Sequence, residues 1–371
     1  MSPLDTRGRT LPAETAAIVR DLLALIRQDG CTDAQFDAAA LQLFSHQYAA
    51  NSPYRRFCQR RGVTPRKVAG WRDIPPVPIS AFKEVTLSCQ PAETCERMFM
   101  TSGTTQAGAR GCHYHPTIEV WDASMRCNFA RRFTSGTQRH PMAILFPPET
   151  ELRNSSLARY LAQAVAGFGT AESRWFVSTQ GMDAAALQAT LREAERRREP
   201  HAMLGASYSF VHLLDELSAQ GTSFQLPAGS LILDTGGYKR SSRELPLDEF
   251  YDTLSGVFGV PRSRCINMYG MTELSTQFYD NGNAVLPSVK SGPHWIRTRT
   301  IDPLSGRDVP RGEPGILVHC DLASFNAATT ILTEDLGVEV DGGFLLLGRA
   351  EGAQAKGCSL AVEEFLRAAA S

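Results

Sequence analysis

Apolar positions near the start of the chain recur at helical spacing. In residues 14–28, apolar side chains share one face and charged side chains share the other, which is the pattern of an amphipathic helix. The apolar positions are Ile18, Leu22, Leu25 and Ile26. We therefore expect a helix that packs one side against the body of the protein.

A second helical pattern, in residues 34–48, leads to a proline-rich stretch that reads DIPPVPISAFKE. Pro75, Pro76 and Pro78 lack backbone N–H donors, and the residue before a proline avoids helical angles, so this stretch favours extended chain. We expect residues 1–97 to form a helical lead-in that ends in an extended segment.

Beyond residue 98, strand-like apolar runs such as MAILFPP, HAMLGAS and SLILDTGG alternate with helical patterns. The expected helices lie near residues 118–133, 156–168, 183–197, 208–219 and 246–256. Such alternation favours parallel strands joined by crossover helices. After His294 the pattern changes to short strands separated by turns. We expect an α/β core over residues 98–290, a β-rich subdomain over 291–349, and a loop followed by a helix over 350–371.

Composition narrows the classes of partner. The chain has 371 residues, of which 43% are hydrophobic and 21% are charged, and its net charge is −1. This balance fits a folded protein with a small-molecule partner better than one that binds nucleic acid or a membrane surface. The nine cysteines include no CxxC pair, and no apolar run reaches the length of an export signal or a membrane span. We expect a cytoplasmic protein with reduced thiols.

The segment TSGTTQAG follows one of the strand-like runs. Thr101, Ser102, Gly103, Thr104 and Thr105 offer small hydroxyls and unhindered backbone amides, which suit the oxygens of a polyphosphate. No G-K-[ST] sequence follows, so this is not a Walker A loop. The alternative is an ordinary turn rich in Gly and Thr.

A second segment, NMYGMTELS, again places a glycine and a threonine after an apolar strand. The ring of Tyr269 can stack on a purine, the hydroxyl of Thr272 can hold a phosphate oxygen, and the carboxylate of Glu273 can bind Mg²⁺. Two such segments in one chain favour a nucleotide site over two unrelated turns.

Together with LDTGGY and TEDLG, these motifs resemble the adenylate-forming superfamily of acyl-CoA synthetases, peptide-synthetase adenylation domains and luciferases, from about Met98 onward. The resemblance implies the large N-terminal domain of that fold, with mixed sheets flanked by helices and a β-rich closing subdomain. It also implies that the mobile C-terminal domain is absent. DIPPVPISAFKE, DTGGYKR, GMTELSTQFYD and PHWIRTR are similar to the short acyl-protein synthetases. The short form also resembles the griseoluteate-adenylating enzyme of phenazine antibiotic biosynthesis.

The resemblance implies a role for each matching residue. The loop that grips the ATP phosphates would be Thr101, Ser102, Gly103, Thr104 and Thr105. The residues along the adenine would be Gly236, Gly237, Tyr238 and Tyr269, with Gly270 and Met271 in the motif of Tyr269.

The remaining roles concern charge. Thr272 would lie at the phosphate and Glu273 would bind Mg²⁺. Asp335 in TEDLG would bind the ribose hydroxyls, and Arg349 in LLGR matches the hinge-region arginine. The implied ligands are therefore ATP and Mg²⁺.

Two departures from the superfamily pattern concern lysines. The superfamily continues its first motif as T-G-x-P-K, whereas this chain has no lysine there and offers Arg110, which is either a replacement or a solvent-facing side chain. A second lysine belongs to the mobile domain. Lys239 and Lys356 are candidate substitutes, although a solvated surface lysine is the more common state for either.

Two further groups can be interpreted in two ways. Cys358 is similar to the cysteine that takes the acyl group in acyl-protein synthetases, where a neighbouring Lys356 would lower its pKa. The alternative is an inert buried thiol. In the segment CHYHP, His113 and His115 share one face of a strand, and packing beside the phosphate loop explains them better than a metal site.

The expected function is ATP-dependent activation of a carboxylic acid to an acyl-adenylate, with release of pyrophosphate. An aromatic antibiotic-precursor acid such as a phenazine carboxylate is the favoured substrate, with an amine, a thiol or a carrier protein as acceptor. The alternatives are a fatty-acid acyl-protein synthetase that acylates itself on Cys358, or a nucleotide- or acid-binding protein with impaired catalysis.

Overall fold

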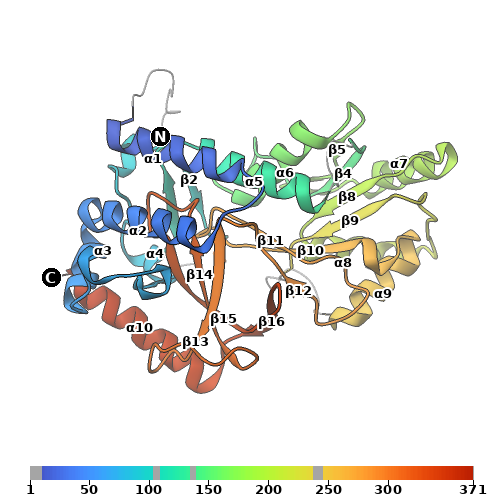
Figure 1. Cartoon of the computed structure of the whole chain (residues 1–371). Coiled ribbons are helices and arrows are strands. Elements are labelled where there is room, and N and C mark those ends of the chain that lie inside the picture. The colour runs from blue at the N-terminus through green and yellow to red at the C-terminus, as the bar shows by residue number, and fades with distance from the viewer. Residues whose placement is uncertain (1–10, 103–108, 134–138, 237–244, 371) are drawn as a thin grey trace. The chain divides into compact units, whose positions relative to one another are not determined.

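The computed structural model describes residues 11–102, 109–133, 139–236 and 245–370. The chain divides into two compact units. Unit 1 consists of Met1–Cys127, Met271–Thr276 and Gly292–Ser371, and unit 2 consists of Asn128–Gly270 and Gln277–Ser291. The chain therefore passes between the units several times (Figure 1).

Helices form the lead-in of unit 1. They are α1 (Ala13–Ile26), α2 (Asp33–Ala50), α3 (Ser52–Arg60) and the short α4 (Ala81–Glu84). A capping box starts α2, because Thr32 Oγ1 accepts from Gln35 N and the Gln35 side chain accepts from Thr32 N. The two helices expected in residues 14–28 and 34–48 are confirmed. Single 3₁₀ turns follow at Pro65–Lys67, Trp71–Asp73 and Ala92–Thr94.

An antiparallel sheet forms the body of unit 1. Its strands follow the order β16 (Gly343–Arg349), β15 (Thr330–Val340), β14 (Pro314–Asp321) and β13 (Ile296–Ile301). The β-rich character expected after His294 is confirmed. Part of the proline-rich segment, for which we expected extended chain, also forms a strand. This strand, β1 (Val77–Pro78), pairs in parallel with β15. Its partners lie more than 250 residues away, which local sequence does not reveal.

Two further elements complete unit 1. A hairpin of β2 (Arg97–Met100) and β3 (Cys112–His115) flanks the segment TSGTTQAG. Helix α10 (Gly352–Ala370) packs Cys358 against Ile316, Val318 and Leu332 of the sheet. We expected residues 350–371 to start with a loop, but α10 begins at Gly352, so Cys358 lies inside a helix. Helix α5 (Glu119–Arg132) contributes residues to both units.

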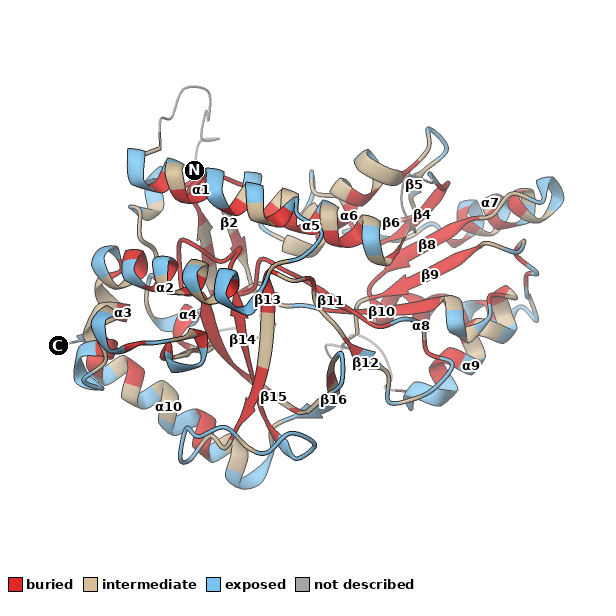
Figure 2. Ribbon diagram, viewed as in Figure 1, coloured by how far each residue is buried: buried red, intermediate tan, exposed pale blue. Residues whose placement is uncertain are grey.

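A mostly parallel sheet forms the centre of unit 2. The strand order is β11 (Phe278–Tyr279), β10 (Cys265–Tyr269), β9 (Leu231–Asp234), β8 (Ala202–Gly205), β4 (Met142–Leu145) and β5 (Arg174–Trp175). Of these strands, only β11 runs antiparallel to its neighbour. Strands β4, β8, β9 and β10 are buried at every position (Figure 2). Burial on both faces is typical of a parallel sheet covered by helices.

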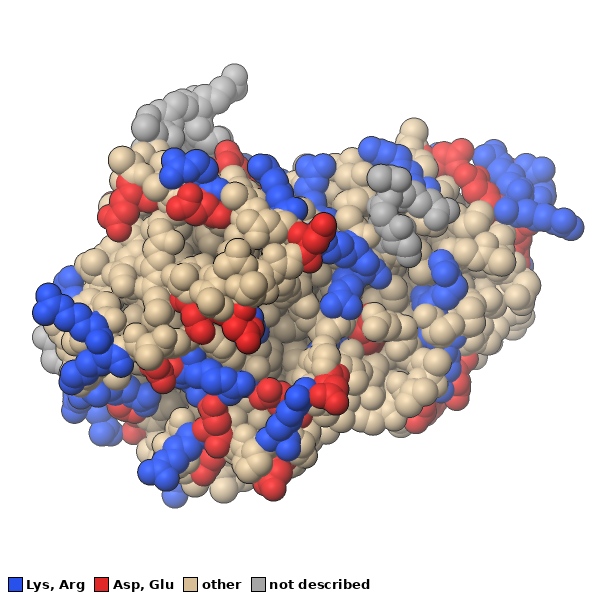
Figure 3. Space-filling view, in the orientation of Figure 1, with Lys and Arg blue, Asp and Glu red and all other residues tan. Residues whose placement is uncertain are grey.

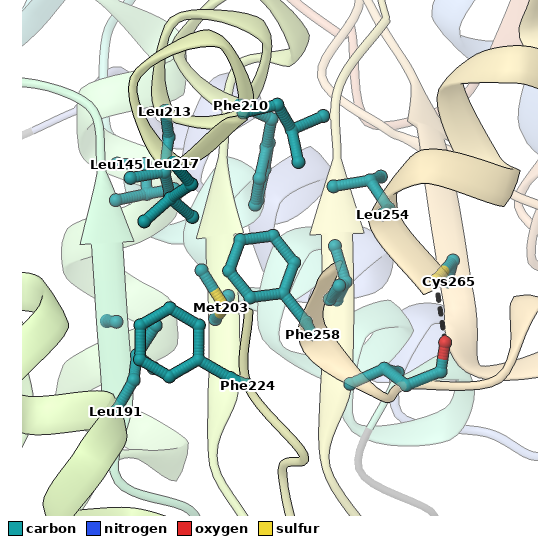
Figure 4. Close-up of a cluster of buried hydrophobic side chains, with 14 of the residues drawn as sticks. Leu145, Leu191, Met203, Phe210, Leu213, Leu217, Phe224, Leu254, Phe258 and Cys265 are labelled. Carbon is teal, nitrogen blue, oxygen red and sulfur yellow. Dashed lines mark hydrogen bonds between the residues drawn. The ribbon is translucent and has the colours of Figure 1, made fainter. Parts of the chain in front are cut away.

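The helices of unit 2 are α6 (Ser156–Phe168), α7 (Ala184–Arg197), α8 (Ser207–Ala219) and α9 (Leu247–Phe258). All five helices expected after residue 98 are confirmed to within a few residues. The remaining elements are the hairpin of β6 (Val177–Ser178) and β7 (Gly181–Met182), the strand β12 (Val289–Lys290) and a 3₁₀ turn at Arg262–Arg264. Figure 4 shows side chains of α7, α8 and α9 around Met203 of β8, among them Leu191, Phe210, Leu217, Leu254 and Phe258.

The surface carries both signs of charge. On the face in Figure 3, Lys and Arg side chains are interspersed with Asp and Glu. Among the described residues, no helix combines the length and the apolar character that crossing a membrane requires.

Candidate functional site

Hydrogen bonds link the end of β2 to the start of β3, on either side of the segment TSGTTQAG. Thr101 N donates to Gly111 O at 2.9 Å, and Gly111 N donates to Thr101 Oγ1 at 3.0 Å. Thr101 and Ser102 are placed, whereas Gly103, Thr104 and Thr105 lie outside the described residues. Arg110 is exposed. The hairpin therefore fixes the base of the expected phosphate loop in unit 1.

Glu273 lies beside this base and is almost fully buried, with 5% of its surface exposed. Burial raises the pKa of its carboxyl from the usual 4.5 to about 7, and the nearby Glu334 adds to the rise, while Lys83 and Arg349 oppose it. A buried carboxyl that titrates near neutral pH is more typical of a functional site than of a solvated surface acid. Glu273 is therefore not a solvated surface acid.

The segment that carries Thr272 and Glu273 is held from two sides. On one side, His113 Nδ1 lies 2.9 Å from Thr272 O. On the other side, the buried Asp321 carboxylate accepts from Ser275 N at 2.8 Å, from Thr276 N at 2.9 Å and from Thr276 Oγ1 at 2.7 Å. These contacts fix the backbone on either side of Glu273.

The rings of His113 and His115 lie next to each other on the buried face of β3, with centroids 4.3 Å apart and planes tilted by 43°. Burial lowers the pKa of His113 to about 4, although the hydrogen bond to Thr272 opposes this effect. His113 is therefore neutral at pH 7. Because a carbonyl oxygen can only accept, Nδ1 of His113 carries the proton. His113 therefore packs beside the segment that carries Thr272, which is the interpretation that the sequence favoured over a metal site.

Asp335 and Arg349 face each other across β15 and β16. They are paired residues in the register of the two strands, and Arg349 Nη1 lies 3.0 Å from Asp335 Oδ1. Arg349 Nη2 also lies 3.7 Å from Glu334. The Ser80 hydroxyl donates to the Glu334 carboxylate. Two acids that are neighbours in sequence thus share one arginine, although the sequence suggested separate roles for Asp335 and Arg349.

Lys83 joins this group, although sequence reasoning missed it. A Cβ atom built on Gly111 would lie 3.1 Å from Thr101 Cγ2, 3.3 Å from Glu273 Oε1 and 3.6 Å from Lys83 Cγ. Three side chains from distant parts of the chain therefore converge on Gly111. The only local signal was the stretch PISAFKE, which contributes to the family resemblance but places nothing by itself.

Of the described residues in the expected adenine motifs, Gly236, Tyr269 and Gly270 lie in unit 2, and Met271 belongs to unit 1. Gly236 adopts a φ of +63° directly after β9, and its N–H donates to Asp234 Oδ1 at 3.1 Å. Asn267 Nδ2 donates to the same oxygen at 2.7 Å. Tyr269 ends β10 and packs on Phe278 with ring centroids 5.9 Å apart, and Gly270 follows it. Gly237, Tyr238 and Lys239 lie outside the described residues.

Asp234 organises this turn and was also missed. Its carboxylate accepts from Ser207 Oγ at 2.7 Å and from Tyr251 Oη at 2.9 Å, besides Gly236 and Asn267. Burial raises its pKa, and the bonds from Ser207 and Tyr251 oppose that rise. Its position before Thr235 and Gly236, at the carboxyl end of a buried strand, was the available sequence signal.

Cys358 differs from the activated thiol that we considered. It is buried within α10, and its Sγ lies 3.9 Å from Thr333 O. Burial raises the pKa of the thiol to about 11, and the charge of Glu334 adds to this effect. The expected lowering by Lys356 is therefore wrong, since Lys356 is exposed and Cys358 titrates far above neutral pH.

The oxygens near Glu273 suit a hard cation. No group of three His, Cys, Asp or Glu side chains within the described ranges is arranged to hold a metal ion by itself. Mg²⁺ in nucleotide enzymes, however, is usually bound by one or two carboxylates together with substrate phosphates. Glu273, with Glu334 close enough to raise its pKa, fits that limited role.

The chain matches known proteins over most of its length. A family model described as "Acyl-protein synthetase, LuxE" matches residues 20–367. The long-chain-fatty-acid–luciferin-component ligase of Vibrio harveyi is 25% identical over 300 residues, which cover 80% of this chain and 76% of that protein. The protein of the same name from Aliivibrio fischeri is 24% identical over 307 residues, covering 81% and 78%.

Solved structures show the same fold. A 2-hydroxyisobutyryl-CoA ligase in complex with 2-HIB-AMP and CoA matches with a TM-score of 0.62 at 15% identity, covering 94% of this chain and 72% of that chain. ATP-bound MatB from Rhodopseudomonas palustris matches with a TM-score of 0.51 at 18% identity, covering 70% and 49%. The expected α/β fold of the adenylate-forming ligases is confirmed. The finer resemblance to the griseoluteate-adenylating enzyme, and with it a role in antibiotic biosynthesis, finds no support in these matches.

Proposed function

The chain belongs to the acyl-protein synthetase family of adenylate-forming ligases, and on this basis we propose that it activates a long-chain fatty acid with ATP. The substrate carboxylate attacks the α-phosphorus, the bond from that phosphorus to its bridging oxygen breaks, and pyrophosphate leaves with the electron pair. The observation that carries the proposal is the convergence of Thr101, Glu273, Asp335 and Arg349 within unit 1.

Each of these residues has a part in the proposed reaction. The Thr101 hydroxyl lies at the base of the loop that would hold the phosphates, with Ser102, Gly103, Thr104 and Thr105 following it in sequence. Asp335 would accept hydrogen bonds from the ribose hydroxyls, and Arg349 would hold that carboxylate in place. Thr272 would donate its hydroxyl to a phosphate oxygen.

Glu273 is the proposed ligand for Mg²⁺. With a pKa near 7, its carboxyl is about half ionised at neutral pH. A cation at this position would favour the ionised form. When bound, Mg²⁺ neutralises charge on the phosphates. The chain's own contribution is to hold this oxygen ligand in a buried position, since the backbone on both sides of Glu273 is fixed.

The adenine contacts are proposed for a second group of residues. They are Gly236, Gly237, Tyr238, Tyr269 and Gly270, with Met271 as the next residue of the same motif. The positive φ of Gly236 supports its part in this proposal, because a residue with a side chain would be strained there.

A fatty acid is preferred over an aromatic acid because the two curated relatives carry names of long-chain fatty-acid ligases. The test is ATP–pyrophosphate exchange by the full chain with fatty acids of increasing length and with aromatic acids, including a phenazine carboxylate. We expect exchange that is fastest with a long-chain fatty acid. Exchange only with aromatic acids would overturn the substrate class, and ATP binding without exchange for any acid would favour the nucleotide-binding alternative.

A matched pair of variants tests the site. Glu273→Gln should lower the exchange rate by roughly a hundred-fold, as the loss of one preorganised charge commonly does. Glu313→Gln, which changes an exposed glutamate at a turn, should leave it unchanged.

The acceptor of the acyl group is an amine, a thiol or a carrier protein, and Cys358 is the enzyme's own candidate thiol. Family membership supports self-acylation, whereas the burial of Cys358 means that α10 would have to move before its thiol could react. Labelled fatty acid and ATP should be incubated with the wild type, with Cys358→Ser and with the control Cys31→Ser. Label lost only in Cys358→Ser identifies Cys358 as the acceptor. Label retained in that variant excludes it, and no label on any form indicates an external acceptor.

A further inference from the structure

The phosphate loop of this chain lacks the lysine found in the corresponding motif of its superfamily. ATP carries several negative charges on its phosphates, and enzymes that cleave it place cations against them. Within unit 1, two cations influence the Glu273 carboxyl, namely Lys83 and Arg349. Arg349 is engaged by Asp335 and Glu334. Lys83 is therefore the cation to consider for the phosphates.

The position of Lys83 is fixed by the pairing of the proline-rich segment with the sheet. Val77 and Pro78 pair with Ile331 and Leu332 of β15, and Ile79 N donates to Leu332 O at 3.0 Å. This register brings α4 alongside the acidic residues that follow on β15. The bond from Ser80 to Glu334 ties the start of α4 to the same strand.

The two faces of α4 have different environments. Phe82 is buried, and its ring packs edge-on against His113 with centroids 5.9 Å apart. Lys83, the next residue, is exposed, while its Cγ lies close to the base of the phosphate segment at Gly111. The buried phenylalanine thus anchors the helix, and the exposed lysine lies beside Gly111.

Lys83 is also available for a ligand. Over the stretches of chain that the structure describes, its ammonium group forms no ion pair or hydrogen bond with a protein group. The positive charge of Lys83 acts on the carboxyl of Glu273, which is the proposed ligand for the cation that accompanies ATP. The charges of these two groups complement those of a nucleotide with its metal ion. The ammonium group suits a phosphate oxygen, and the buried carboxyl suits the metal ion.

We propose that Lys83 supplies the positive charge to the β- and γ-phosphates of ATP that the superfamily takes from its loop lysine. This inference rests on the proposed adenylation function. Lys83 donates N–H bonds to non-bridging oxygens of the departing pyrophosphate. The carboxylate oxygen forms its bond to the α-phosphorus, and pyrophosphate leaves with the electrons of the broken bond.

Binding of two nucleotides tests the inference without turnover. ATP in the presence of Mg²⁺ and AMP are titrated by calorimetry into the wild type, Lys83→Gln, Lys83→Met and Lys83→Arg. We expect the two neutral variants to bind ATP at least roughly ten-fold more weakly and AMP unchanged, because AMP lacks the β- and γ-phosphates. Lys83→Arg should recover most of the ATP affinity. Lys67→Gln, which changes an exposed lysine whose ammonium donates to Gly62 O at 2.9 Å, should match the wild type.

Exchange kinetics complete the test. We expect kcat/KM for ATP to fall by about a hundred-fold in Lys83→Gln while the KM for the acid stays constant. Unchanged ATP affinity in both neutral variants, or equal weakening of ATP and AMP, would overturn the role of Lys83. If the wild type exchanges with no acid, the proposed function fails, and the difference between ATP and AMP still decides whether Lys83 contacts the phosphates.

Discussion

At the scale of the residue, Glu273 gives a pH-dependent prediction. In the folded protein, burial raises the pKa of its carboxyl from the usual 4.5 to about 7. The folded state therefore holds this proton more tightly than the unfolded chain. Below about pH 4.5, the protonated carboxyl adds about 3 kcal/mol to the free energy of unfolding. This contribution is lost as the pH rises through about 7.

Glu273→Gln removes this titration and should show its effect in unfolding experiments. Without ligands, we expect the variant to be more stable than the wild type at pH 8 and close to it at pH 4.5. Urea unfolding across this range, with Glu313→Gln as the control, measures the difference. Equal pH dependence in Glu273→Gln and the wild type would contradict the raised pKa.

Residue types in local motifs were predictable, and their partners were not. The Tyr-Gly-x-Thr-Glu segment identified Glu273 because its residue types and spacing are specific. The sequence offered Arg110 as the replacement for the loop lysine, and the structure also places Lys83 beside Glu273. That neighbour depends on a parallel pairing between residues 77–78 and 331–332, which no local pattern encodes.

At the scale of the element, the segment around Glu273 depends on one buried carboxylate. Asp321 ends β14 and accepts from Ser275 and Thr276, and it also accepts from Ala323 N at 3.0 Å. Oδ2 accepts from two backbone N–H groups, and Oδ1 accepts from the third. An asparagine has only one side-chain oxygen, so in either orientation at least one of these buried donors would lose its acceptor.

Asp321→Asn should therefore weaken both stability and exchange. We expect a loss of about 1–3 kcal/mol in the free energy of unfolding. We also expect a lower kcat, because the backbone that carries Glu273 loses its anchor. Asp302→Asn, at an exposed turn where the carboxylate accepts from Leu304 N at 2.9 Å, is the control. An Asp321→Asn variant with normal kcat would show that the anchor does not influence the site.

The elements themselves were largely predictable. The helices of unit 2 carry long apolar periodicities, so their positions followed from the sequence. The β1 strand and the helix around Cys358 could not be predicted from the sequence. A two-residue strand has no periodicity of its own. Helix α10 is held in place by tertiary contacts such as the packing of Phe57 of α3 on Phe365, with centroids 4.8 Å apart.

At the scale of the whole molecule, the two units differ in how the chain builds them. The main core of unit 2 lies within residues 143–265. Unit 1 takes β13 to β16 from the last 80 residues, while β1 and α3, which pack on β15 and α10, come from the first 127. One unit is therefore nearly continuous in sequence, and the other is assembled from distant segments.

This difference predicts how fragments behave. A fragment of residues 119–291 should fold cooperatively because it contains its own core, whereas residues 292–371 alone should not, because β15 lacks β1 and α10 lacks α3. Circular dichroism and thermal melts of the two fragments measure this. A cooperative transition in residues 292–371 alone would contradict the expected dependence on the N-terminal segments.

The sequence by itself determined the fold class, the helices, the two nucleotide motifs and the family resemblance, because periodicity and motif spacing are local properties. Only the tertiary structure decided which charged groups meet. Glu273, Lys83, Glu334 and Arg349 come from three separated stretches of chain and converge through strand pairing. Their protonation depends on burial, which exists only after the chain has folded.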